Sequence, residues 1–394
     1  MEQINDLANF GKSKVLVAGG LGFIGSNFIR ALFNASPEVC VICFDKQTYS
    51  GNPANLDDVR MRFGDKQFIE IKGDVSNKED LVLPFSYEPD YVINFAAETH
   101  VDRSIHVGSI EFINTNVIGV YNILEAVKAT PSVKKYLQVS TDEVYGQLPN
   151  PFDIPEDVME TVQYKVEPYM RSIPSQMVAK WMKFNRQSVF KPNVPYSATK
   201  ASGDCLCNAY HHTWHVPVVV THCSNNYGPY QYPEKMLPFW ATRLLKGEKI
   251  PIYGDGFNIR DWIHVDDHIT ALCAVLLRGE PGKDYLIGAD NERTNLEMAQ
   301  LISEVIKGDK DWKENIEFVE DRPGHDRRYA IDHSDITKEL GWIPKYGKEE
   351  FPNKLNETLQ WYSDHQDWSD EIIKRTGVAN PHIDLWRGQL KNND

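Results

Sequence analysis

The sequence predicts an α/β fold, built on a doubly wound parallel sheet with a smaller, mostly C-terminal second domain. Two observations carry this prediction. Short apolar runs alternate with helix-period segments up to residue 145, and the same rhythm resumes after residue 195. Strands that alternate with helices are typical of a parallel sheet covered by helices on both faces.

The elements follow in order along the chain. Five apolar runs in the N-terminal part are expected to be strands, at 15–18, 40–44, 68–71, 91–95 and 136–140. Between them, the apolar spacing predicts helices over 23–33 and 110–127. The stretch 146–195 holds seven prolines and no long apolar period, so an insertion is expected at about 147–195. After it we expect helices at 197–212 and 266–277, and strands at 218–222 and 285–288.

Composition excludes several classes of function. The 394 residues include 42 Lys and Arg against 56 Asp and Glu, a net charge of -14. An acidic chain of this kind is not expected to bind nucleic acid or an anionic membrane. No run approaches the ~18 apolar residues of a membrane span, and no leader is visible at the N-terminus, so a cytoplasmic location is expected. Cys40 and Cys43 form a C-x-x-C without a second pair, which favours free thiols over a metal site.

The first chemical motif is the segment 19–25, GGLGFIG, which follows the first strand and opens the first helix. Glycines at these positions let backbone N–H groups approach a pyrophosphate at the helix N-terminus. Asp45 lies twenty residues beyond Gly25, at the end of the second strand. A carboxylate there suits the ribose 2′-hydroxyl, which favours NAD over NADP. The alternative is a glycine-rich turn without a ligand.

The second motif is the pair Tyr196 and Lys200. Spacing of four residues on a helix places both side chains on one face. A nearby ammonium group favours the phenolate and is expected to lower the Tyr196 pKa, which makes a base for an alcohol. A surface pair is the alternative interpretation.

The third motif is Thr141, Asp142 and Glu143, at the end of the fifth strand. Ligands of open α/β sheets bind at this edge. Adjacent carboxylates in a continuing strand face opposite ways, so the chain must bend for both to reach one ligand. Two carboxylates in one cleft raise each other's pKa, which yields an acid and a base together. The alternative is a solvated acidic turn.

With these three motifs, the chain resembles the extended short-chain dehydrogenases that act on nucleotide sugars, and among them the dTDP-glucose 4,6-dehydratase family. The resemblance covers about residues 13–365. The acidic pair discriminates within the superfamily, because related epimerases lack both carboxylates and the decarboxylases carry a Ser-Glu version. The segments that carry it are 19–25, 45–52, 96–104, 141–143, 224–229, 233–235, 260–262 and 322–329.

The resemblance implies a Rossmann fold and a redox-neutral reaction, in which dTDP-glucose becomes dTDP-4-keto-6-deoxyglucose. C4 is oxidised, water is eliminated across C5 and C6, and C6 is reduced. Tyr196 would take the C4 hydroxyl proton, Glu143 the C5 proton, and Asp142 would protonate the departing C6 hydroxyl. Thr141 would hydrogen-bond O4, and Lys200 would hold the nicotinamide ribose.

The resemblance also assigns binding residues, with no metal among the ligands. The NAD site would comprise Gly19, Gly22, Phe23, Ile24, Gly25, Asp45, Lys46, Thr48, Asp74, Val75, Ala96, Ala97, Thr115, Tyr196, Lys200 and Asn226. The nucleotide-sugar site would comprise His100, Thr141, Asn225, Glu234, Lys235, Arg260, Asn295, Arg322, His325 and Tyr329. In the second set, Lys235, Arg260, Arg322 and His325 form the local cationic cluster expected for an anionic substrate.

Two domains are expected: an NAD-binding Rossmann domain over 1–223, to which a helix at 265–278 returns, and a substrate-binding domain over 224–394. The resemblance implies a homodimer formed through the helices at 110–127 and 197–212. Three alternatives stay open. They are a UDP-glucose 4,6-dehydratase, an epimerase or decarboxylase of the same superfamily, and a non-catalytic NAD-binding regulator.

Overall fold

The computed structural model describes residues 6–153, 177, 180–308 and 311–376. Its largest element is a seven-stranded sheet in which all neighbouring strands are parallel. The strand order reverses between β1 and β4, which is where ligands bind in open sheets of this kind. The order across the sheet is β10 (Asp284–Ile287), β6 (Val218–Cys223), β5 (Lys135–Thr141), β4 (Tyr91–Asn94), β1 (Lys14–Ala18), β2 (Cys40–Asp45) and β3 (Phe68–Lys72).

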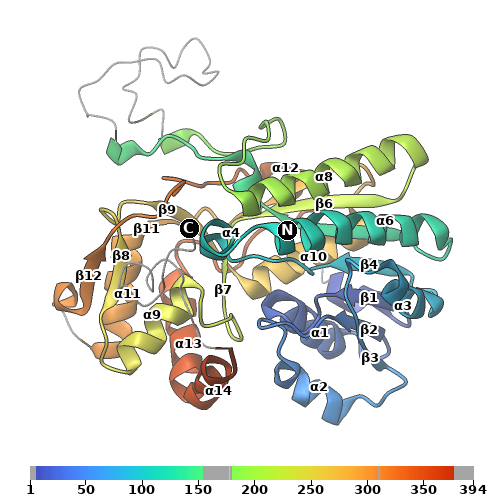
Figure 1. The fold of residues 1–394 in the computed structure, drawn as a ribbon, viewed down its shortest axis with the longest axis horizontal. Coiled ribbons are helices and arrows are strands. Elements are labelled where there is room, and N and C mark those ends of the chain that lie inside the picture. Colours follow the sequence, from blue (N-terminus) through green and yellow to red (C-terminus); the bar gives the residue numbers. More distant parts are fainter. Residues whose placement is uncertain (1–5, 154–176, 178–179, 309–310, 377–394) are drawn as a thin grey trace.

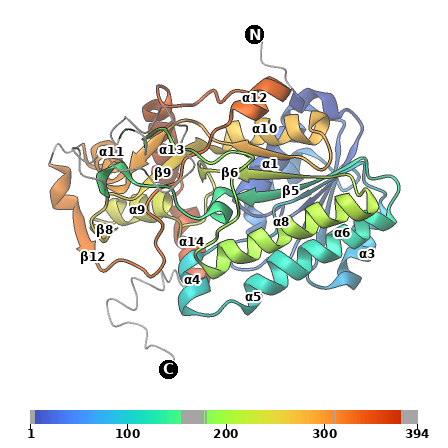
Figure 2. The same cartoon turned by 90° about the horizontal axis from the view of Figure 1, so that it is seen from above.

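Helices cover both faces of this sheet (Figures 1 and 2). On one face lie α1 (Phe23–Ala35) and α10 (Val265–Arg278), and on the other α6 (Gly119–Ala129) and α8 (Pro195–Trp214). Successive side chains of β1 point to opposite faces of the sheet and so pack against both helix layers. Val15 and Val17 pack in the core with α1 and α10, whereas Leu16 packs in the core with α6 and α8.

A second unit packs around its own core, beside the carboxyl ends of the large sheet (Figure 1). Its strands form two small sheets. The three-stranded sheet contains β11 (Glu292–Thr294), β9 (Ile259–His264) and β7 (Asn225–Tyr227), and the two-stranded sheet contains β12 (Ile316–Val319) and β8 (Ile250–Tyr253). Its helices are α9 (Met236–Leu245), α11 (Asn295–Lys307), α13 (Phe351–Asp364) and α14 (Gln366–Thr376).

Shorter helices complete the described chain. They are α2 (Asp57–Arg62), α3 (Val82–Ser86), α4 (Val101–His106), α5 (Ile110–Ile113) and α12 (Ser334–Leu340). A π-helical turn, Asn114–Ile118, joins α5 to α6. Single 3₁₀ turns occupy Asp6–Phe10, Pro53–Leu56, Lys78–Leu81, Asp142–Tyr145, Pro151–Asp153 and Trp312–Asn315.

The predicted α/β class and doubly wound sheet are confirmed, and each predicted strand lies within two residues of an observed one. Elements beyond the expected boundary at residue 223 also join the large-sheet unit. β10 pairs in register with β6, and α12 packs in the same core as α1 and α10. Most of the expected insertion, 154–176 with 178 and 179, lies outside the described residues, as do 377–394.

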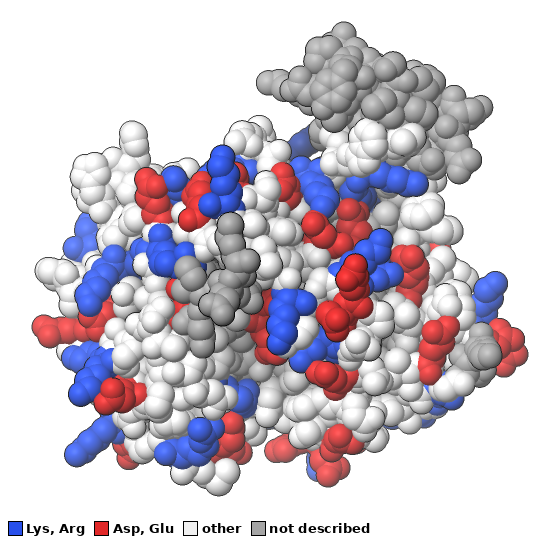
Figure 3. All heavy atoms as spheres, turned by 180° about the vertical axis from the view of Figure 1, so that it is seen from behind, with Lys and Arg blue, Asp and Glu red and all other residues white. Residues whose placement is uncertain are grey.

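Charges of both signs intermingle on the face of the molecule shown in Figure 3. Within the part of the chain that the structure describes, no helix has the length and apolar character needed to cross a membrane.

Candidate active site

Three adjoining cavities lie along the carboxyl edge of the large sheet. The cradle cavity is bordered by Gly19, Asp45, Asp74 and Thr115. The central cavity contains Gly25, Thr141, Tyr196 and Lys200. The outer cavity opens toward the second unit and contains His100, Arg260 and Arg322. The central and the outer cavity are both lined by Glu143, Asn225, Glu234 and Lys235. The two cavities therefore meet at the glutamate of the acid pair.

The glycine-rich turn between β1 and α1 has no room for side chains at its key positions. Gly19 has a φ of +76°, and a Cβ on it would lie 2.5 Å from the backbone nitrogen of Ala96. A Cβ on Gly25 would overlap the carbonyl oxygen of Gly19. Gly22, the N-cap of α1, supplies no side-chain acceptor, so the first N–H groups of the helix are available to an anion. This cradle fits the pyrophosphate of a dinucleotide.

Asp45 is buried at the end of β2 and holds the cradle together. Its Oδ2 accepts the N–H of Leu21 at 3.0 Å, and its Oδ1 accepts the N–H of Gln47 at 2.7 Å. Burial raises the pKa of Asp45, and these two backbone N–H groups oppose the shift. At the other wall of the cavity, the Lys46 ammonium pairs with Asp74 at 2.8 Å.

The acid pair sits where the chain turns out of β5. Asp142 and Glu143 begin the 3₁₀ turn, so the bend that the sequence required is present. Thr141 caps this turn: its Oγ1 accepts the N–H of Glu143 at 3.3 Å. Burial and the neighbouring Glu143 raise the pKa of Asp142 well above its ordinary value. Burial also raises the pKa of Glu143, but Arg322 and Arg260 oppose this shift.

Tyr196 and Lys200 lie one turn apart on α8, and both are buried in the central cavity. The expectation that Lys200 lowers the Tyr196 pKa is not met in this structure. Burial, followed by the charge of Glu143, raises the pKa of Tyr196 well above its ordinary value. Nζ of Lys200 donates to the carbonyl oxygen of Val139 at 2.7 Å.

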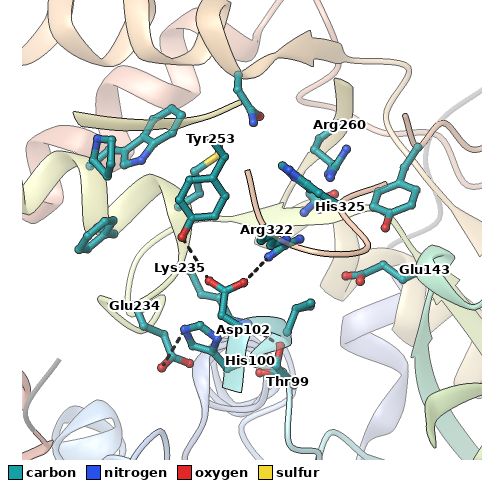
Figure 4. Close-up of a pocket in the computed structure, with 18 of the residues that line it drawn as sticks. Thr99, His100, Asp102, Glu143, Glu234, Lys235, Tyr253, Arg260, Arg322 and His325 are labelled. Carbon is teal, nitrogen blue, oxygen red and sulfur yellow. Dashed lines mark hydrogen bonds and ion pairs between the residues drawn. The ribbon is translucent and has the colours of Figure 1, made fainter. Parts of the chain in front are cut away.

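Basic side chains converge on the outer cavity, as Figure 4 shows. Arg260 donates to the carbonyl oxygen of Asp326 at 2.9 Å, and its guanidinium lies 4.3 Å from the ring centroid of Tyr329. Lys235 donates to the carbonyl oxygen of Thr99 at 2.7 Å. His325 belongs to this group but carries no positive charge, because burial and the neighbouring Arg322 lower its pKa to about 3. The expected cationic cluster therefore reduces to three cations.

Every residue predicted for the catalytic, cofactor and substrate sites borders one of the three cavities. Sequence reasoning missed Asp102 and Tyr253. Both line the outer cavity. Asp102 accepts a hydrogen bond from Arg322, and the Tyr253 hydroxyl donates to Asp102. A carboxylate two residues after His100, inside a segment already singled out, was the available signal for Asp102. Tyr253 had none, because it reaches the site only through the packing of β8.

No group of three or more His, Cys, Asp or Glu side chains within residues 6–153, 177, 180–308 and 311–376 is arranged to hold a metal ion.

Comparison with known proteins shows which family and which enzymes this chain is similar to. A model of the NAD dependent epimerase/dehydratase family matches residues 15–288. The dTDP-glucose 4,6-dehydratase 1 of Escherichia coli (strain K12) is 39% identical over 372 residues, which are 91% of this chain and 95% of that protein.

Two solved structures are also similar. The dTDP-glucose 4,6-dehydratase of Bacillus anthracis, in complex with NAD, has 39% identity and a TM-score of 0.76, with 91% of this chain and 99% of that chain covered. The dTDP-glucose 4,6-dehydratase of Streptomyces venezuelae, also with NAD bound, has 36% identity, a TM-score of 0.78 and the same coverage.

Proposed function

Because the chain belongs to the NAD dependent epimerase/dehydratase family, we propose that it is an NAD-dependent dTDP-glucose 4,6-dehydratase. The observation that carries this proposal is the acid pair. Asp142 is buried and Glu143 is partly buried beside it, both next to Tyr196, and Glu143 borders both the central and the outer cavity. An elimination across C5 and C6 needs an acid and a base at neighbouring atoms, and this pair can supply both.

NAD fits the cradle and central cavities, because the glycine-rich turn packs too closely for a Cβ at Gly19 or Gly25 and leaves the first N–H groups of α1 available to a pyrophosphate. The residues that would hold it are the glycine-rich turn, Asp45 at the ribose, Asp74 at the adenine side and Lys200 at the second ribose. When bound, NAD supplies the hydride acceptor and donor that a redox-neutral dehydration requires.

The chain's own groups then move three protons. Tyr196 accepts the proton of the C4 hydroxyl, helped by the Thr141 hydroxyl beside it. The ketone formed at C4 acidifies the C5 proton, which Glu143 removes. Asp142 donates its proton to the C6 hydroxyl, which leaves as water, and Glu143 returns a proton to C5 when C6 is reduced. The division of roles follows from the surroundings, because Arg322 and Arg260 favour the ionised form of Glu143 and the Glu143 charge favours the protonated form of Asp142.

The diphosphate of the substrate is assigned to Arg260, Arg322 and Lys235. A guanidinium fork binds two phosphate oxygens at once, which suits a diphosphate better than a single ammonium. Asn225, Asn295, His100, His325, Glu234 and Tyr329 complete the wall of the outer cavity and are assigned to the sugar and nucleotide.

A substrate panel tests the activity. The protein is incubated with NAD and, separately, dTDP-glucose and UDP-glucose, and products are identified by mass. Loss of one water from dTDP-glucose, with kcat/KM higher than for UDP-glucose, is expected. An isomer of unchanged mass indicates an epimerase, and release of CO₂ from a nucleotide uronate indicates a decarboxylase. NAD binding without any turnover indicates a regulator.

The organisation of the chain is part of the proposal. We assign NAD binding to the large-sheet unit, including β10, α10 and α12, and substrate binding to the second unit. The helices α4, α5, α6 and α8 lie along one side of the molecule (Figure 2). A homodimer through them is supported by exposed apolar side chains that these segments carry, namely Val107, Ile110, Ile113, Ile118, Tyr121 and Trp214. The mass in solution, measured by light scattering, tests it.

A cytoplasmic location is proposed from the cysteines. All six are free, and four of them are fully enclosed in the fold. Free thiols are typical of proteins in a reducing compartment. Localisation of a tagged full-length chain tests this assignment.

A further inference from the structure

A buried hydrogen-bond network lies next to the acid pair and takes no part in the proposed proton transfers. Its centre is Asp204, on α8 one turn beyond Lys200, with 3% of its surface exposed. Oδ2 of Asp204 accepts the Ser140 hydroxyl at 2.6 Å and lies 3.2 Å from Nε2 of His222. Nδ1 of His222 lies 3.1 Å from the hydroxyl of Tyr145.

The network holds both ends of the segment that carries the acid pair. Ser140 is the residue before Thr141 in β5, and Tyr145 closes the 3₁₀ turn that contains Asp142 and Glu143. One end reaches Asp204 directly and the other reaches it through His222. A single buried carboxylate therefore restrains the turn from both sides.

The contacts agree with one arrangement of protons. With neutral His222 protonated on Nε2, the ring donates to Asp204 and accepts the Tyr145 hydroxyl at Nδ1. Ser140 donates to the same oxygen of Asp204. Two donors, Ser140 and His222, thus reach Oδ2 of Asp204, and the Tyr145 hydroxyl donates to His222 behind them.

Fold stability does not account for an aspartate at this position. Oδ1 of Asp204 is buried and has no hydrogen-bond partner among the described residues. A buried oxygen without a partner costs free energy, and such exceptions concentrate at functional sites. The negative charge also acts on Lys200: burial lowers the Lys200 pKa, and Asp204 is the first of the groups that oppose this, ahead of Cys223 of β6 and Cys207 of α8.

We propose that Asp204 is a positioning residue for the dehydration, a role that rests on the proposed function. Through Ser140 and the His222–Tyr145 pair it fixes the turn that presents Asp142 and Glu143, and its carboxylate belongs to the residue one helical turn beyond Lys200 on α8. The side chain itself touches neither the central nor the outer cavity.

Asp204→Asn tests the role, because it keeps the shape of the side chain and removes its charge. We expect kcat to fall by about 10- to 100-fold, the loss that follows when reacting groups are displaced by a fraction of an ångström to one ångström. KM and the Kd for NAD, titrated separately, should not change. The alkaline limb of the kcat profile should move to lower pH, because Lys200 loses the neighbouring negative charge. Asp204→Glu should restore part of the activity.

Tyr145→Phe probes the far end of the network and keeps the proposal testable if the Asp204 variant does not fold. The ring keeps its packing against Phe184 and Phe190 and loses only its hydroxyl. A smaller fall in kcat is expected, and the double variant should lose no more than Asp204→Asn alone, because both changes act through one chain of hydrogen bonds. Ser202→Ala, at an exposed position of the same helix, is the matched control.

The outcomes separate the two proposals. Wild-type kcat and an unshifted pH profile for Asp204→Asn, or additive losses in the double variant, overturn the positioning role and leave the dehydratase proposal intact. No turnover of any nucleotide sugar by the unaltered protein overturns the proposed function and the positioning role with it.

Discussion

Nη1 of Arg322 lies 2.9 Å from Oδ1 of Asp102, and this ion pair joins segments 220 residues apart in the chain. The other carboxylate oxygen of Asp102 accepts the Tyr253 hydroxyl at 3.2 Å. Asp102 belongs to α4 beside the large sheet, whereas Tyr253 belongs to β8 in the second unit. One buried carboxylate therefore orients an arginine of the outer cavity and links the two halves of the site (Figure 4).

Asp102→Asn should weaken substrate binding more than catalysis. Loss of a charged hydrogen bond that orients Arg322 is worth about 1.5–3 kcal/mol, so KM for dTDP-glucose should rise by about 10-fold or more with a smaller change in kcat. Steady-state kinetics measure both. Tyr253→Phe is the control, because it leaves the ion pair in place. An unchanged KM would show that Arg322 does not need Asp102 to bind the diphosphate.

Glu143→Gln and Asp142→Asn should each lower turnover by about 10²- to 10⁴-fold, the usual worth of a positioned acid or base. NAD affinity should change little, because both side chains border the central cavity but neither is among the residues assigned to hold NAD. Product formation by mass and NAD affinity by fluorescence provide the two readouts. Activity within a few-fold of wild type in both variants would remove the acid pair from the mechanism.

Glu234 should make stability depend on pH. Burial raises its pKa to about 7 against an ordinary 4.5, with Lys235 and Arg103 opposing the shift. The folded state therefore binds the proton more tightly than the unfolded state, so this contribution to stability is present at low pH and is lost as pH rises from about 4.5 to 7.

Glu234→Gln should flatten that dependence, by up to about 3 kcal/mol in the free energy of unfolding across the window. Denaturant titrations of both proteins at several pH values measure it. Parallel pH profiles for wild type and variant would contradict the assignment to Glu234.

Gly19→Ala should abolish NAD binding. The new Cβ would lie 2.5 Å from the nitrogen of Ala96, in a residue that already has a φ of +76°. Gly11→Ala is a matched control, because Gly11 has a φ of +52° and nothing within 4 Å of a Cβ. The control separates the strain of a positive φ from the clash in the cradle. Equal NAD affinity in the two variants would show that close packing at Gly19 does not matter for the cofactor.

Trp368→Phe should weaken NAD binding without altering the acid pair. Nε1 of Trp368 in α14 donates to Oδ1 of Asn55 at 3.0 Å, and Nδ2 of Asn55 donates to the carbonyl oxygen of Leu21 in the glycine-rich turn at 3.0 Å. Loss of one hydrogen bond of about 0.5–1.5 kcal/mol should raise the Kd for NAD by up to about tenfold. Isothermal titration measures it, with the exposed Trp214→Phe as the control. A Kd equal to that of the control would leave α14 without a role at the cradle.

The sequence was most informative where local pattern and tertiary position coincide. Most residues of β1, β2, β4 and β6 in the large sheet are apolar and buried, so Val15, Val41 and Val219 mark their strands without knowledge of the fold. The strands of the second unit carry no such mark. β9 contains Arg260 and Asp261 and is nevertheless wholly buried, and β8 contains Pro251.

The same distinction holds at the site. Residues in compact motifs, such as Thr141 to Glu143 or Tyr196 with Lys200, could be predicted because their spacing expresses their geometry. Asp204 and Tyr253 could not, because their partners come from β5, β6 and α4 and meet them only after folding. The contact of the Lys200 ammonium with the carbonyl oxygen of Val139 is likewise a property of packing.

The position of β10 has a consequence for how the chain is made. β10 completes the large sheet by covering the outer edge of β6, yet it is encoded more than sixty residues after β6. Until it leaves the ribosome, the wholly buried β6 presents open N–H and C=O groups beside apolar side chains, a template for intermolecular strand pairing. A nascent or truncated chain that ends near residue 223 is therefore exposed to aggregation and to chaperone capture, and the sheet closes only after β7, α9, β8 and β9 of the second unit have been synthesised.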